Sequence, residues 1–175
     1  MLDTPSNVVV DEDAAEQTVN LAGIGAGGGE SQALQVTASS SDTGLIPDPT
    51  VTYTSANSTG SIAFTPVSDQ SGTATITVTV EDGGLDGDLN TTGDNATFSR
   101  TFDVTVNAVN DTTTLDNIAD VTIDEDAAEQ TVNLAGISAG GGELQPLRVT
   151  ASSSDTRSEE RPVGRECRSR WSPDH

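Results

Sequence analysis

The chain has 175 residues, of which 28 are acidic and 7 are basic, so its formal net charge is −21. A surface this acidic repels nucleic acid and anionic membranes and attracts cations, although charge of this kind also serves solubility alone. No run of about 18 apolar residues occurs, so we expect no direct membrane insertion.

Thr, Ser, Gly, Val and Asp dominate the chain, a composition typical of β-strands and turns rather than helices. Short segments with alternating apolar residues are separated by Gly, Pro, Asn and Asp. Seven strands are predicted: 7–10, 18–21, 33–41, 50–55, 61–65, 73–80 and 97–108. Seven such strands in about 110 residues indicate an all-β fold, a seven-stranded antiparallel sandwich of two sheets.

The last predicted strand, 97–108, places the aromatic side chain of Phe98 on the inward face together with Phe102, Val104 and Val106. Arg100 has the same phase, so we expect it near a strand end or a sheet edge rather than in the core.

A long internal repeat sets the domain organisation. Residues 11–44 recur as residues 124–157 with 29 of 34 positions identical, at an offset of 113 residues. This period suits tandem domains of about 100 residues. We therefore expect a complete sandwich over 1–110 and, over 111–156, the truncated start of a second copy, too short to bury its apolar face and so frayed. The glycine-rich segment 23–29 is interpreted as a flexible loop.

The composition changes abruptly at residue 157. Residues 157–175 hold five of the seven arginines and the only Cys, Trp and His. They resemble the conceptual translation of a sequencing adapter, so we interpret them as a non-native, disordered tail outside the fold. The alternative is a basic C-terminal anchor.

The loop over 81–95 is rich in Asp, Asn and Gly. Its Asp86-x-Asp88-x-Asn90 pattern has the alternating spacing of a calcium loop. Calcium binds six to eight oxygen ligands, and Asp and Asn side chains supply them. Thr97 stands where an EF-hand has its Glu, so the loop is not an EF-hand. Asp86 and Asp88 are candidate metal ligands, and a solvated turn is the alternative.

Several motifs of residues 1–156 resemble tandem cadherin-like or immunoglobulin-like repeats of giant bacterial surface or secreted adhesins. They are Gly60-Ser-Ile62, Asp69, Val78-Thr-Val80-Glu-Asp82-Gly-Gly84, Val104-Thr-Val106-Asn-Ala-Val109-Asn110-Asp111 and Ile123-Asp-Glu125-Asp-Ala127. The resemblance implies calcium between successive repeats. By position its ligands at the junction of the two copies are Glu12, Asp69, Asn110 and Asp111, and Asp82 faces a preceding repeat at the opposite end.

Two hypotheses for function follow. The first is a structural spacer of a long extracellular or cell-surface repeat protein, stiffened by calcium at its domain junctions, with neighbouring repeats as partners. The second is a module that binds a cell-surface or matrix glycan or protein through calcium in the 81–95 loop; an exposed aromatic residue nearby would favour it. We expect no enzyme, since residues 1–156 lack His, Cys and Lys, although a glycosidase using paired carboxylates remains formally open. An export signal is expected elsewhere in the parent protein.

Overall fold

The computed structural model describes residues 1–154, and the sequence interpretation of the tail lies outside them. These residues form seven strands and no helix, and each predicted strand is present with bounds shifted by at most a few residues. Accordingly, no helix in this range could cross a membrane. The strands are β1 (Val8–Asp11), β2 (Gln17–Leu21), β3 (Leu34–Ser40), β4 (Thr50–Thr52), β5 (Gly60–Phe64), β6 (Gly72–Asp82) and β7 (Thr97–Asn107).

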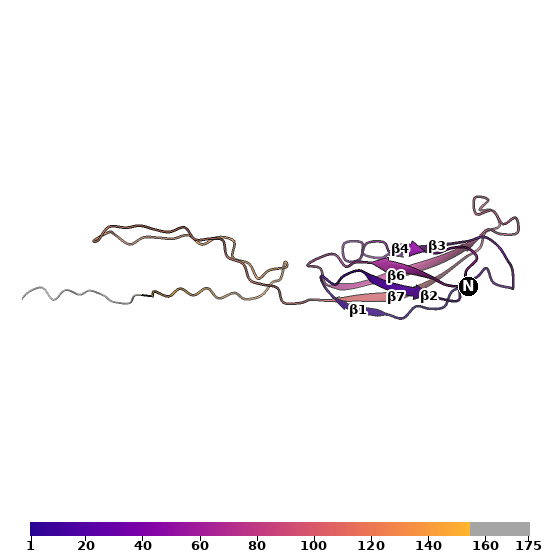
Figure 1. The fold of residues 1–175 in the computed structure, drawn as a ribbon, viewed down its shortest axis with the longest axis horizontal. Helices are drawn as coiled ribbons and strands as arrows, with labels where there is room; N and C mark the ends of the chain where they lie inside the picture. The colour runs from indigo at the N-terminus through magenta and orange to yellow at the C-terminus, as the bar shows by residue number, and fades with distance from the viewer. Residues whose placement is uncertain (155–175) are drawn as a thin grey trace, which may run out of the picture.

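The strands make two sheets that enclose the core as a β-sandwich (Figure 1). One sheet has the order β1-β7-β6-β3 and the other β2-β5-β4, an immunoglobulin-like topology with the first strand on the larger sheet. The expectation of a purely antiparallel sandwich is wrong in one place: β1 pairs with β7 in parallel. The chain enters beside β2, where the Asp3 amide donates to the Ala22 carbonyl (3.0 Å), and then crosses to the other sheet.

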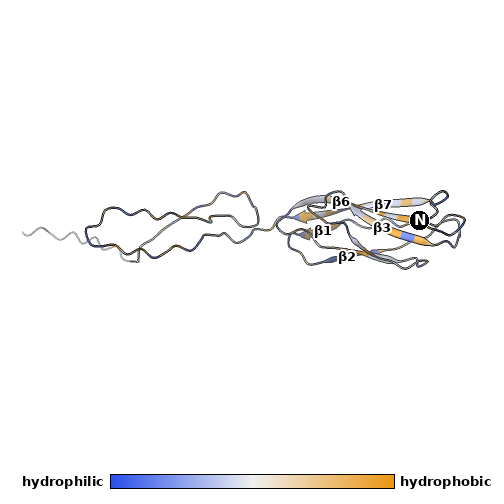
Figure 2. Ribbon diagram, turned by 90° about the horizontal axis from the view of Figure 1, so that it is seen from above, coloured by the Kyte–Doolittle hydropathy of each residue, from blue (hydrophilic) through white to orange (hydrophobic). Residues whose placement is uncertain are grey.

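The core follows from the alternation of β6 and its register with β3 and β7. Ile76 and Val78 of β6 and Val104 of β7 are fully buried, while the Thr residues between them point to solvent. Figure 2 shows the hydrophobic colour concentrated along the strands of the sandwich. Truncating one such side chain to Ala costs about 2–5 kcal/mol of stability.

The prediction that Phe98 lies inside is wrong, because its side chain is 37% exposed. Its partner on β6, Val80, is buried, so the strand phase itself is correct. The reason is the limited pairing of β1: it pairs with β7 only from Val104 onward, and Phe98 lies on the half of β7 that has no strand on that side. The edge position expected for Arg100 is confirmed, since its guanidinium lies exposed over the Phe98 ring.

The second copy leaves the sandwich as extended chain, seen as the orange trace in Figure 1. Within the described residues from 108 to 154 the only strand pairing is the isolated bridge between Thr114 and Ser138. This bridge lies at the positions of Met1 and Gly25 in the first copy, which are also hydrogen-bonded. The second copy therefore repeats the local contacts of the first without forming a sheet.

Candidate metal centre

The acidic run at the end of β1 is fixed by backbone bonds. Glu12 follows the last residue of β1 and is only 6% exposed. Its amide donates to the Asn107 carbonyl (2.9 Å), and its Oε1 accepts from the amide of Val109 (2.6 Å). Glu12 thus ties the end of β1 to the segment that leaves β7.

Two groups of three carboxylates meet at this end of the sandwich. Within each group, one oxygen from every residue lies within 4.8 Å of the others; the groups are Glu12, Asp111 and Glu143, and Asp13, Asp69 and Asp111. Asp111 belongs to both groups. The structure therefore brings together three of the four residues predicted for the junction, Glu12, Asp69 and Asp111.

The fourth predicted residue, Asn110, belongs to neither group. Its Oδ1 accepts a hydrogen bond from Gln145 (2.9 Å), and its Nδ2 donates to the Asp111 carbonyl (3.0 Å). Asn110 thus positions the chain on either side of the cluster, and its side-chain oxygen already has a donor.

Glu143 is the ligand candidate that sequence reasoning missed. It follows three glycines of the second copy, and its Oε2 accepts from the amide of Asp111 (3.3 Å). A Cβ on Gly141 would overlap Asp111 Oδ2, and Gly141 has a positive φ of 42°. The segment interpreted as a flexible loop is therefore, in its second copy, the part that brings Glu143 to the junction.

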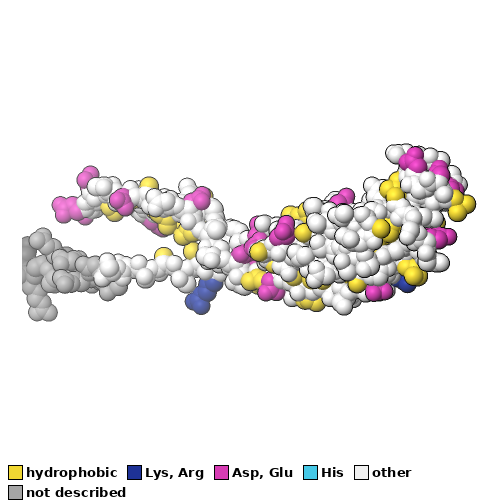
Figure 3. Space-filling view, turned by 45° about the vertical axis from the view of Figure 1, so that its right-hand side comes forward, with side chains coloured by type: hydrophobic (Ala, Val, Ile, Leu, Met, Phe, Trp, Pro, Cys, Tyr) yellow, Lys and Arg dark blue, Asp and Glu magenta, His cyan; other side chains and the backbone are white. Residues whose placement is uncertain are grey.

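The charges of the cluster are not balanced, and on the face shown in Figure 3 acidic side chains (magenta) outnumber basic ones (dark blue). Partial burial, then the charges of Asp69, Glu12, Glu143 and Asp13, raise the pKa of Asp111 above its ordinary value. Every one of these neighbours is negative. Asp111 Oδ2 is also buried without a hydrogen-bond partner, although buried polar atoms in proteins nearly always have one.

The donor set fits a hard cation such as calcium. Calcium binds carboxylate and carbonyl oxygens at about 2.3–2.6 Å, so oxygens on opposite sides of one ion lie about 5 Å apart. Within each group the oxygens lie within 4.8 Å of one another, close enough to bind one such ion together. Asp111 and the four carboxylates around it could supply ligands to one ion or to two.

The residues predicted at the opposite end have other roles. Asp82 is buried, and its Oδ1 accepts from the amides of Gly84 (3.1 Å) and Ala96 (3.0 Å), which closes the base of the 81–95 loop. Within that loop, Asp86 accepts from the amide of Asp88 (2.9 Å). None of the carboxylate groups found in the described chain includes Asp82, Asp86 or Asp88.

Asp88 shows why the loop pattern does not gather ligands. Its Oδ1 accepts from both the amide (2.9 Å) and the side chain (2.8 Å) of Asn90. These bonds, the backbone one first, lower the pKa of Asp88. The alternating spacing therefore builds successive Asx turns, in which the carboxylates bond to the backbone two residues on.

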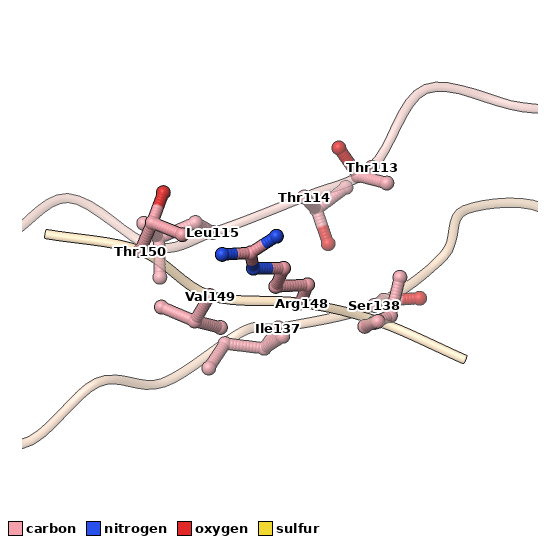
Figure 4. A pocket seen from close by; sticks show the side chains of 9 residues that line it. Thr113, Thr114, Leu115, Ile137, Ser138, Arg148, Val149 and Thr150 are labelled. Atoms are coloured by element: carbon pink, nitrogen blue, oxygen red, sulfur yellow. The ribbon is translucent and has the colours of Figure 1, made fainter. Parts of the chain in front are cut away.

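A hollow of about 260 Å³ lies in the second copy (Figure 4). Leu115, Ile137 and Val149 line it and are 42–52% exposed, whereas Leu2, Ile24 and Val36, at the same positions of the first copy, are buried. The hollow is thus the second copy's counterpart of the first copy's core, not a ligand site.

No protein-family model matches the chain, and no curated protein matches it. Among solved structures it is similar to domains 4 and 5 of the S-layer protein SbsC, with 17% identity and a TM-score of 0.40 over 61% of this chain and 46% of that one. It is also similar to the titin domains Z1Z2 in complex with telethonin, with 15% identity and a TM-score of 0.33 over 69% and 52%. The chain spans about half the length of these solved chains, and at such scores neither likeness carries an argument about function.

Proposed function

We propose that the chain is a structural spacer of a long extracellular or cell-surface repeat protein of the adhesin type, with calcium held where successive repeats meet. The observation that carries the proposal is the unbalanced carboxylate cluster built from both copies, centred on the buried, unpartnered oxygen of Asp111. A catalytic role is not part of the proposal.

Four separate segments meet at the cluster, one of which is the turn between β5 and β6 that carries Asp69. Glu12 is held rigidly at the end of β1, Asp111 lies in the segment between the copies, and Glu143 comes from the second copy. A bound calcium ion would supply the positive charge that these oxygens lack. Without it their repulsion pushes the segments apart, so calcium would stiffen the junction.

The first copy carries the same glycine loop, ending in Glu30, at the other end of the sandwich. Its Ala26 is partly exposed, whereas Ala139, at the same position of the second copy, is 4% exposed against the junction. Within the proposal, Glu30 rather than the structural Asp82 is the residue presented to a preceding repeat. Neighbouring repeats are thus the main partners.

A second candidate is favoured by one specific observation. Phe98, the aromatic residue nearest the 81–95 loop, is exposed at the base of that loop, and such a residue can stack on a glycan or on a protein partner. The calcium part of this candidate is less well supported, because the loop carboxylates are bonded to their own backbone.

The test is thermal unfolding of the 175-residue chain as free calcium is raised. A ligand that binds only the native state raises the melting temperature with its concentration. The proposal expects a rise that Asp111→Ala greatly reduces and that Asp86→Ala with Asp88→Ala leaves intact. A rise that survives Asp111→Ala but is lost in Asp86→Ala with Asp88→Ala would place calcium in the 81–95 loop and favour the second candidate. No rise in any of the proteins would refute both calcium assignments.

A further inference from the structure

The first half of β7 has an unpaired outer edge. On its inner side β7 pairs with β6 along its whole length, but on its outer side β1 pairs only with Val104 and the residues after it. The Asp103 amide, next to the end of the ladder, is covered only by the Asn7 side chain (3.0 Å). Residues 97–102 therefore form a sheet edge.

The direction of the backbone groups on this edge follows from two bonds. The Asp82 amide donates to the Ala96 carbonyl (3.0 Å), so even-numbered residues of β7 face β6, and Asp103 faces outward. Thr97, Ser99 and Thr101 thus present their N–H and C=O groups outward. Within residues 1–154 these groups bond to no other backbone group, and all three residues are exposed.

The position beside this edge continues the line of β1. β1 occupies the next strand position beside the second half of β7, so a strand beside residues 97–101 would lie in line with β1. Residues 1–3 run beside residues 22–25, which follow β2, and the Leu2 carbonyl accepts from Arg100 Nε (3.3 Å). The N-terminal residues thus lie against the Arg100 side of this edge, which favours a single extended strand over a whole second sandwich as the occupant.

Two side chains on this edge offer sequence recognition. Phe98 borders a hollow of about 220 Å³ that is also lined by Met1, Ala26 and Val80. Two residues on, the guanidinium of Arg100 lies 4.5 Å from the centroid of the Phe98 ring. Arg100 is the only cationic side chain in residues 1–147, so it singles out an acidic group.

We propose that the β7 edge, residues 97–101, binds an extended peptide strand of another polypeptide by β-augmentation. The strand runs parallel to β7 as β1 does, with an apolar residue facing Phe98 and an acidic residue two positions later facing Arg100. Backbone bonds to Thr97, Ser99 and Thr101 supply affinity, and the two side-chain contacts supply specificity. This surface lies away from the carboxylate cluster and does not depend on calcium.

A suitable probe comes from the chain itself: a fluorescent synthetic peptide of residues 119–127, which contains Ile123-x-Glu125. Binding to the 175-residue protein is followed by fluorescence anisotropy, and the edge by amide hydrogen exchange. Since the protein's net charge repels the peptide, the salt should be at least 0.15 M, where the screening length is about 8 Å. We expect the peptide to slow exchange at Thr97, Ser99 and Thr101 and not elsewhere on β7.

Two variants separate the contacts. Ser99→Pro removes an outward N–H without breaking a bond to β6 and should abolish binding, while Thr79→Ala, which removes only the side-chain partner of Ser99, should not. Arg100→Glu should weaken binding about tenfold or more, and a peptide carrying Lys in place of Glu125 should recover it. Thermal unfolding checks that each variant is folded.

Three results would overturn the proposal. One is slow exchange of the three edge amides in the free protein, which would mean that the edge is already covered. Another is equal peptide binding by the folded Ser99→Pro variant. The third is protection that grows with protein concentration without peptide, which would make a second copy of this chain the occupant.

Discussion

Replacing Glu143 by Gln tests the junction most directly, because the chain carries its own control. The substitution keeps the side-chain size and removes one of the five carboxylates. Glu30 stands at the matching position of the first copy, but it belongs to neither carboxylate group of the described chain. The same change, Glu30→Gln, therefore alters the net charge equally without touching the cluster.

The size of the effect follows from linkage. At a free calcium concentration of 100 times Kd, binding stabilises the native state by about 2.7 kcal/mol. Loss of one charged contact raises Kd about tenfold, which leaves about 1.4 kcal/mol at the same calcium concentration. For a sandwich of about 100 residues, the difference of about 1.3 kcal/mol corresponds to roughly 5–10 °C in melting temperature.

The assay compares the melting temperatures of the parent chain and both variants, by circular dichroism, in chelator and in calcium. We expect the calcium-induced rise to be smaller in Glu143→Gln and unchanged in Glu30→Gln. An equal loss in both variants would mean that calcium acts on the overall negative charge. An unchanged rise in Glu143→Gln would show that the second copy contributes no ligand.

Three further predictions concern backbone geometry and protonation. Gly141→Ala, whose Cβ would overlap Asp111 Oδ2, should weaken calcium binding. Gly28→Ala has a similarly positive φ but no close neighbour, so it should only cost about 1 kcal/mol of stability. Calorimetry on both variants separates the effect of the steric overlap on calcium binding from the effect of backbone strain on stability. In chelator, the free energy of unfolding should fall as pH rises through the raised pKa of Asp111, because the native state holds the proton of this carboxyl group more tightly than the unfolded chain does. Denaturant titrations at several pH values should show that this pH dependence is lost in Asp111→Asn. Tyr53 is the only tyrosine, and burial raises its pKa, so its absorbance titration should have a midpoint above that of the urea-unfolded chain. The free energy of unfolding should decline as pH rises above the pKa that Tyr53 has in the unfolded chain.

Much of the fold could be predicted because alternation is a local signal. Each of the seven strands places apolar residues on one face, and burial of that face fixes the register without further information. The exposure of Phe98 shows the limit of this reasoning. Alternation says which face a side chain takes, but the covered length of β7 depends on where β1 crosses between the sheets, a long-range property that the strand's own residues do not encode.

The candidate site was predictable only where its carboxylates stand in recognisable sequence motifs. Glu12, Asp69 and Asp111 were found in this way, and the structure brings them together. Asp82 was assigned to metal by position, yet its carboxylate closes a loop by accepting from two backbone amides. Sequence position alone cannot distinguish these uses, because both need a carboxylate at the end of a strand.

Glu143 was missed for a different reason, and the repeat held the missing signal. A glycine loop looks flexible in isolation, but residues 26–30 and 139–143 are identical, including the Glu that ends the loop. In the second copy this loop approaches Asp111 so closely that its middle position, Gly141, has no room for a Cβ.

One end of a unit therefore carries Glu12, Asp69 and Asp111, and the other end carries the glycine loop. A contact between unlike ends is heterologous, and heterologous contacts that do not close into a ring extend into open arrays. The placement of these few side chains thus favours a linear string of repeats, with one acidic junction between each pair.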